Sequence, residues 1–202
     1  PLGEDALSLP VRTGKARVIG IEPASLVTKS LVREVKTDDA GCFQSALNPG
    51  LTKIAVIERH KRTGKLGIGI LEGYGLTGGA IATTISHDSH NIVVAGDNDP
   101  DMLLAVRELA DMGGGIVSVH GGAIRRLPLP IAGLMTSADP QEVNAVLHDM
   151  LVAARAELGI PEDVEPFMTL SFMALPVIPE LKLTARGLFN VNTFSSVGVE
   201  AD

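Results

Sequence analysis

The sequence is poor in aromatic residues, in cysteine and in net positive charge. It contains no Trp, one Tyr and five Phe among 202 residues, so an apolar core must be built from aliphatic side chains and Met. Cys42 is the single cysteine, which excludes a disulfide framework and a cysteine-based zinc site and favours a reducing compartment, the cytoplasm. The net charge of −7 excludes the basic surface on which nucleic-acid binders depend.

The sequence also lacks a long apolar run. None approaches the roughly 20 residues that a membrane-spanning helix needs, so we expect no contact with a membrane. Hydrophobic residues make up 45% and charged residues 20% of the chain, as in ordinary globular proteins. We interpret residues 1–15 as a linker or extended arm, residues 16–191 as one domain and residues 192–202 as a tail.

Turn-forming residues separate short segments with strand character. The expected strands are 17–22, 30–36, 53–60, 66–71, 80–85, 91–96, 115–120 and 123–127. The turn KRTGK makes a hairpin of 53–60 and 66–71, and 80–85 forms a second pair with 91–96. Two apolar segments, 127–135 and 166–184, are interpreted as an extended strap and as core.

Two helices carry clear start signals. Asp99 is expected to cap a helix over 99–112 with Pro100 at its first position, and Asp139 with Pro140 repeats the pattern. The second helix has an apolar face at positions 143, 146, 147, 150, 151, 154 and 158. Strand 91–96, helix 99–112 and strand 115–120 have the length of a βαβ crossover. The sequence therefore predicts an α+β fold, a mixed sheet with hairpins, one βαβ-type crossover and two well-capped helices packed on the sheet.

The densest polar cluster is the connection SHDSHN, residues 86–91, between two apolar strands. His87, Asp88 and His90 are candidates for a supporting catalytic role, because imidazoles beside a carboxylate can position a water or move a proton. Ser89 and Asn91 are candidates for substrate binding. In the alternative interpretation, Asp88 and Ser89 only form the turn and the histidines cap strand ends.

A second polar cluster ends the strand 53–60. The period of two places Glu58 and His60 on one face and Arg59 on the other. Glu58 and His60 are further candidates for substrate binding, as a carboxylate–imidazole pair at a sheet edge. The alternative is a solvated strand end that enters a basic turn.

Five segments, in order, carry a resemblance to a known family. They are VIGIEPASLVTKSLVREVK, KIAVIERHKRTGKLGIGILEGYGLTGGAIATTISHDSHNIVVAGDNDPDML, GGGIVSV, LPLPIAGLM and FMTLSFMALPVIPELKLTARGLFNV. Together they resemble the C-terminal domain of bacterial adenine deaminases, of the amidohydrolase superfamily, from about Arg17 to Val191. Residues 16–191 would then be that domain, and Pro1 the start of a fragment.

The resemblance implies a hydrolase of adenine catabolism that converts adenine and water to hypoxanthine and ammonia. In that family an N-terminal barrel portion holds a divalent metal, Mn or Fe, and that barrel is absent from this sequence. We therefore expect no metal ligands in this chain and no activity of the chain alone. We expect it to support the barrel, to present residues 87–91 near the barrel's mouth, and to form a homo-oligomer.

Two other functions remain compatible with the sequence. One is a purely structural or oligomerisation domain, in which SHDSHN is a rigid hairpin connection. The other is a free-standing small-molecule-binding protein without catalysis.

Overall fold

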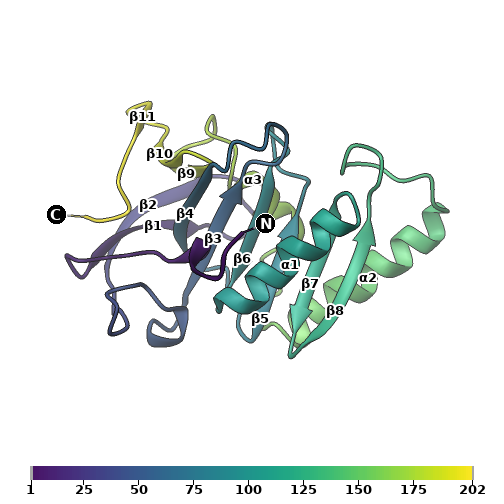
Figure 1. The fold of residues 1–202 in the computed structure, drawn as a ribbon, viewed down its shortest axis with the longest axis horizontal. Helices are drawn as coiled ribbons and strands as arrows, with labels where there is room; N and C mark the ends of the chain where they lie inside the picture. Colours follow the sequence, from purple (N-terminus) through teal and green to yellow (C-terminus); the bar gives the residue numbers. More distant parts are fainter. Residues whose placement is uncertain (1, 202) are drawn as a thin grey trace.

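A large twisted β-sheet organises the chain, whose computed structural model describes residues 2–201 (Figure 1). Its strands are β1 (Lys15–Ile21), β2 (Thr28–Glu34), β3 (Leu51–Ile57), β4 (Leu66–Glu72), β5 (Gly79–Thr83), β6 (Ile92–Gly96), β7 (Gly115–His120) and β8 (Ala123–Pro128). They lie in the order β2-β1-β4-β3-β6-β5-β7-β8. β1 runs parallel to β4, and the other neighbours are antiparallel, so the sheet is mixed as expected.

The expected hairpins and the crossover are confirmed. β3 pairs with β4, and β5 pairs with β6, both antiparallel. β6 and β7 are each antiparallel to β5 and therefore parallel to each other, with β5 between them. Helix α1 (Asp99–Asp111) joins them across one face of the sheet. The βαβ unit is thus split by the strand that precedes it in the sequence.

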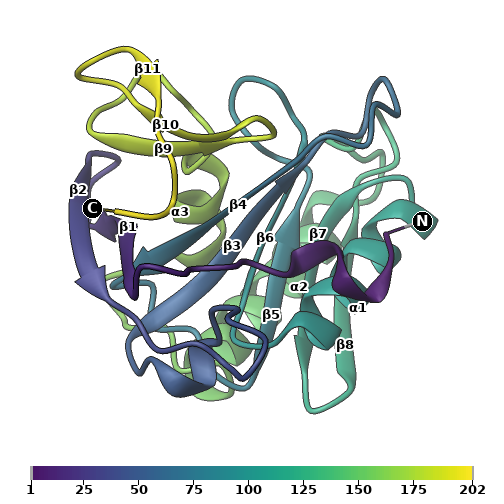
Figure 2. The ribbon, with the colours of Figure 1, turned by 60° about the vertical axis from the view of Figure 1, so that its left-hand side comes forward.

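The two faces of the sheet are covered by different elements (Figure 2). On one face, α1 and the 3₁₀ helix η1 (Glu4–Leu7) pack on alternate side chains of β3, β5, β6 and β7. On the other face lie α2 (Pro140–Ala156), α3 (Pro166–Phe172) and a small sheet of β9 (Leu181–Thr184), β10 (Gly187–Asn190) and β11 (Ser195–Ser196). A second 3₁₀ helix, η2 (Ser45–Leu47), precedes β3. The fold is α+β, as the sequence predicted.

The start of α1 differs from the expectation by one residue. Asn98, not Asp99, is the N-cap: its backbone is extended, and its Oδ1 accepts a hydrogen bond from Asp101 N at 2.9 Å. Asp99 lies inside the first turn, where its carboxylate interacts favourably with the positive end of the helix dipole. Asp139 caps α2 as predicted and accepts a hydrogen bond from Gln141 N at 2.8 Å.

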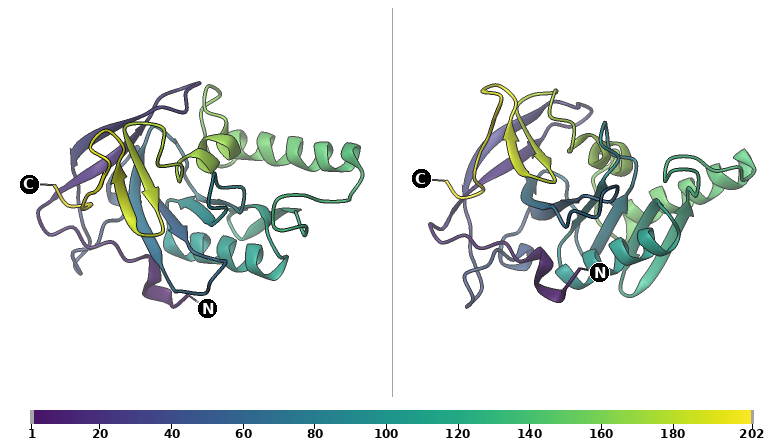
Figure 3. Two further views of the ribbon diagram at one scale, coloured as in Figure 1. Left: turned by 90° about the horizontal axis from the view of Figure 1, so that it is seen from above. Right: turned by 45° about the horizontal axis from the view of Figure 1, so that its top comes forward.

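Helix α2 is buried over only part of its length. Met150 and Ala154 in its C-terminal half belong to the core, whereas Val146 is 37% exposed. The expected apolar face is therefore wrong at this position, because the N-terminal half of α2 projects beyond the rest of the fold (Figure 3). Among residues 2–201, no helix has both the length and the apolar character needed to cross a bilayer.

The two ends of the described chain pack on β1 and on the sheet. Leu7, Leu9 and Val11 are buried. Near the other end, Arg17 N donates to Val199 O at 2.6 Å, beside an antiparallel bridge between residues 16 and 200. Pro1, on which the expectation of a fragment partly rested, lies outside the described residues.

Candidate functional site

The pairing of β3 with β6 brings the two polar clusters of the sequence to one end of the sheet. Ile57, the last residue of β3, is opposite Ile92, the first residue of β6. The connection after β3 (residues 58–65) therefore lies beside the connection before β6 (residues 84–91). His60 and Ser89 meet directly, with 2.8 Å between His60 Nε2 and Ser89 O. A carbonyl oxygen only accepts, so this contact places a proton on Nε2.

The connection 84–91 folds back onto helix α3. His87 N donates to Ser171 O at 3.0 Å, and the His87 ring packs on Phe172 with the centroids 4.5 Å apart. His90 N donates to Ser86 O at 2.6 Å. The backbone and one ring of the connection are therefore held by α3 and by the connection itself.

The two histidines of this connection lie edge to face, with 5.8 Å between the ring centroids. Burial lowers the pKa of His90, and the nearby His87 and Arg59 lower it further. These effects outweigh the opposite effect of Asp88 and favour the neutral form of the His90 imidazole. In this state one ring nitrogen is a donor and the other an acceptor.

Glu58 is occupied by the turn that follows β3. Its carboxylate accepts hydrogen bonds from the backbone N–H groups of His60 and Lys61, each at 2.6 Å, and from Thr63 N and Oγ1, each at 3.0 Å. The bonds from Thr63 and Lys61 are the main cause that lowers the pKa of Glu58 to about 2. The structure thus shows contact of Glu58 with the His60 backbone, and the His60 ring points to Ser89 instead.

A cleft of about 750 Å³ opens between these connections and the small sheet. Five of the seven candidate residues line it: Glu58, His60, Asp88, Ser89 and Asn91. The side of β10 closes it through Phe189, and Arg186 adds a positive charge at the rim. His87 and His90 are not among the lining residues.

The connection 84–91 holds most of the unpaired buried polar atoms of the described chain. Within residues 2–201, four buried side-chain atoms have no hydrogen-bond partner: Ser86 Oγ, His90 Nδ1, Asn91 Oδ1 and Ser118 Oγ. Three of them fall between residues 86 and 91. Buried polar groups in folded proteins are almost always paired, with protein groups or with ordered water, so this concentration marks a polar interior beneath the connection.

A metal centre does not fit the residues of the connection. In the part of the chain that the structure describes, no three side chains of His, Cys, Asp or Glu are grouped to hold an ion. His87 and His90 alone offer two imidazoles, whereas a closed site needs about four ligands.

The sequence interpretation assigned no role to Arg59, which joins the connection to another segment. Its Nε donates to His90 O, and its Nη2 donates to Ala132 O, each at 2.6 Å. Of the expected strap 127–135, the first two residues belong to β8, and the name is kept below for residues 129–135. The strap therefore lies against the connection 84–91. The alternation of faces predicted that Arg59 points away from Glu58 and His60. It could not show which segment of the fold Arg59 contacts on that side.

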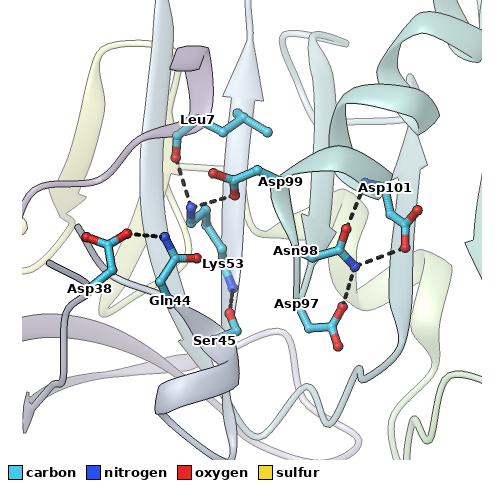
Figure 4. Close-up of polar contacts among 9 residues, drawn as sticks. All are labelled: Leu7, Asp38, Gln44, Ser45, Lys53, Asp97, Asn98, Asp99 and Asp101. Carbon is cyan, nitrogen blue, oxygen red and sulfur yellow. Dashed lines mark hydrogen bonds and ion pairs between the residues drawn. The ribbon is translucent and has the colours of Figure 1, made fainter. Parts of the chain in front are cut away.

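A second polar cluster that sequence reasoning missed lies on the α1 side of the sheet (Figure 4). Lys53 Nζ contacts Asp99 Oδ1 at 2.5 Å and Leu7 O at 3.0 Å, and Lys53 N donates to Ser45 Oγ. The signal was a lysine inside the apolar run KIAVI. These contacts join four segments of the fold and lie apart from the cleft.

Known proteins match nearly the whole chain. The family model of the adenine deaminase C-terminal domain matches residues 25–195. Over 202 residues the chain is 59% identical to the adenine deaminase of Nitratidesulfovibrio vulgaris, covering 98% of this chain and 35% of that protein. It is 47% identical over 199 residues to adenine deaminase 2 of Carboxydothermus hydrogenoformans, with 98% and 35% covered.

The matches agree in extent as well as in kind. The adenine deaminase of Clostridium acetobutylicum is 45% identical over 194 residues, which cover 96% of this chain and 34% of that protein. The chain spans about a third of the length of the curated relatives it matches. The resemblance noted in the sequence is confirmed, and the chain belongs to the adenine deaminase C-terminal domain family.

Proposed function

We propose that this chain is the C-terminal part of an adenine deaminase, a cytoplasmic hydrolase that converts adenine and water to hypoxanthine and ammonia. Its relatives bear that name, and each is about three times as long as this chain. The remaining two thirds would supply the barrel that holds Mn²⁺ or Fe²⁺, the ion that activates the attacking water. Residues 2–201 group no three side chains fit to hold an ion, so in this proposal they act on the substrate by contact and positioning.

We propose that the connection 84–91 faces the mouth of that barrel. The observation that carries this proposal is the open cleft of about 750 Å³ that Glu58, His60, Asp88, Ser89 and Asn91 line. Asp88 and Ser89 are exposed on this cleft, so their side chains can contact a surface or ligand from outside the chain.

The side chains suit the handling of a purine. The Asn91 amide offers an acceptor and donors together, the pattern by which Asn pairs with the edge of adenine. The neutral His90 imidazole can accept a proton at one nitrogen while it donates from the other. Asp88 is exposed and carries no hydrogen bond to hold it elsewhere within the described residues, so its carboxylate is free to face the other portion.

The test is substitution in the full-length protein. We expect His87→Ala, Asp88→Ala or His90→Ala to lower adenine turnover by about 10² for at least one of the three, while the melting temperature changes little. The matched control is His120→Ala, because His120 lies at the opposite end of β7 and bonds only Gly78 O through its ring. Near-normal turnover in all three variants would leave the structural interpretation of the connection in place.

The isolated chain provides a second test. We expect the 202-residue chain to show no adenine turnover with added Mn²⁺ or Fe²⁺, and to bind either ion weakly. Turnover by the chain alone, or a stoichiometric metal content after purification, would contradict the division of roles proposed above.

A further inference from the structure

Arg59 connects two segments that are far apart in the sequence. Its guanidinium donates to His90 O in the connection 84–91 and to Ala132 O in the strap, each at 2.6 Å. The contact leaves no room at Gly133, where an added Cβ would lie 2.7 Å from Arg59 Nη2. The guanidinium therefore fills the space between the strap and the connection.

The strap is itself fixed to the central sheet. Thr84 Oγ1 donates to Gly133 O at 2.6 Å and accepts a hydrogen bond from Gly115 N, at the start of β7, at 2.8 Å. Arg59 consequently ties His90 to a segment that is anchored on β7. The other end of the connection bonds β7 directly, since Thr84 N donates to Gly115 O at 3.0 Å, and Arg59 adds a link at the His90 end.

The charge of Arg59 is not neutralised by an ion pair. Among residues 2–201, the ion pairs of arginine involve Arg33, Arg125 and Arg126, and Arg59 is absent from them. Arg59 is half-buried, and this burial lowers the pKa of its guanidinium. Placing a charge there costs desolvation energy without the return of a paired carboxylate.

We infer that Arg59 is a positioning residue that holds the His90 end of the connection 84–91 in its working geometry. Its catalytic consequence rests on the function proposed above. Its structural part, that Arg59 orders the connection and sets the electrostatic surroundings of His90, stands on the contacts of this chain alone. Arg59 would act through His90 and not by touching the substrate.

The test compares Arg59→Met with Arg17→Met in the full-length protein. Arg17 is a matched control, since its Nη1 also donates to two backbone carbonyls, those of Gly198 and Glu200, away from the connection. We expect Arg59→Met to lower kcat by about 10²-fold, the effect of a small displacement of a reacting group. Arg17→Met should lower the melting temperature about as much as Arg59→Met does, but it should leave kcat unchanged.

Arg59→Lys tests whether the loss of kcat in Arg59→Met comes only from a loss of folding. A lysine keeps the charge but reaches one carbonyl at a time and lacks the planar fork. We expect the kcat of Arg59→Lys to lie between that of Arg59→Met and that of the unaltered protein. If Arg59→Met and Arg17→Met reduced kcat equally, Arg59 would have only a general structural role and the inference would be overturned.

A second readout follows the histidine itself, by NMR titration of the imidazoles in the 202-residue chain. The charged and titratable groups near His90 are His87, Arg59, Asp88 and His60. Arg59→Met removes one positive charge, so the pKa of His90 should rise, whereas Arg17→Met should leave it unchanged. An unaltered pKa of His90 in Arg59→Met would overturn the inference.

The two readouts separate this inference from the proposed function. If the alanine variants of residues 87–90 kept full turnover while Arg59→Met still shifted the His90 titration, the proposed function would fail and the holding role of Arg59 would stand. If those variants lost turnover while Arg59→Met kept full kcat and left the His90 titration unchanged, the proposed function would stand and the holding role of Arg59 would fail.

Discussion

Lys53 and Asp99 form an ion pair whose lysine is almost completely removed from water. Nζ lies 2.5 Å from Asp99 Oδ1, and the Lys53 side chain is 3% exposed while that of Asp99 is 23% exposed. The same Nζ donates to Leu7 O. The pair therefore fastens the N-terminal segment and helix α1 to the middle of β3, as Figure 4 shows.

Removing one partner of this pair should have unequal effects. Asp99→Asn leaves the buried ammonium without a counter-charge, and we expect it to lower the free energy of unfolding by about 3 kcal/mol. Lys53→Met leaves a carboxylate that water can reach, so its cost should be smaller. Urea denaturation of both variants measures the order. Lys29→Met, which breaks an exposed pair with Glu22, is the control and should cost less than either change to the buried pair.

The N-cap of α1 should not tolerate Asp, although Asp and Asn are about equal at this position in general. Asn98 Nδ2 donates to Asp97 Oδ1 and to Asp101 Oδ2, each at 2.9 Å. Asn98→Asp would place three carboxylates together, and we expect a loss of about 1–2 kcal/mol in thermal or urea denaturation. Added salt should recover part of this loss by screening. Asp139→Asn, the matched change at the N-cap of α2, should be nearly neutral, and an equal loss there would contradict this explanation.

Lys182 should make stability depend on pH above neutrality. It is fully buried, its Nζ donates to Leu26 O at 2.8 Å, and burial lowers its pKa to about 8 from 10.5. Between pH 10.5 and 8 the unfolded chain takes up a proton that the folded chain does not, so the penalty grows as the pH falls through this window and is complete below pH 8. We expect Lys182→Met to stabilise the chain at pH 7 by on the order of 1–2 kcal/mol.

The measurement is urea denaturation of Lys182→Met and of the unaltered chain at pH 7 and at pH 10.5. The advantage of the variant should nearly disappear at the higher pH, because the lysine is then neutral in the folded chain and has lost its proton in half of the unfolded chains. An advantage that stayed constant over this range would show that packing, not the charge of Lys182, is responsible.

The strap should take part in association. Ile131 is 46% exposed and Met135 is 58% exposed, and Arg59 holds this segment beside the connection 84–91. We expect the isolated chain to self-associate and the double change Ile131→Asp, Met135→Asp to reduce this, as measured by light scattering. Val32→Asp is the control, since Val32 is 51% exposed on β2, at the other end of the sheet. A monodisperse monomer at high concentration would contradict the prediction.

Local order in the fold was predictable because it depends on neighbours in the sequence. The hairpins β3–β4 and β5–β6, the crossover through α1 and the Asp139 cap all follow from turn residues and from periodicity. The lateral order of the strands did not follow, since β1 pairs with β4 and β3 pairs with β6 across long separations. Burial patterns fix which face of a strand is inside, but they do not say which strand lies next to it.

The candidate site shows the same division. The polar residues of 86–91 stood out in the sequence, and the pairing of Ile57 with Ile92 explains why His60 joins them. Arg59 had no signal, because its partners are backbone carbonyls, which any residue carries. The N-cap at Asn98 was misjudged because three successive residues can each cap, and the distant Lys53 decides where Asp99 goes.

The contact of β1 with residues 199–201 has a consequence for aggregation. Arg17 N bonds to Val199 O, and Ala201 N bonds to Lys15 O, so the late residues cover backbone groups of β1 that β4 does not reach. Cleavage after Ser196 would leave the large sheet folded but uncover this row of donors and acceptors. Such an open row is a template for the backbone of another chain. A protease that trims these residues would thereby add a second surface, separate from the strap, through which the domain can recruit its own copies.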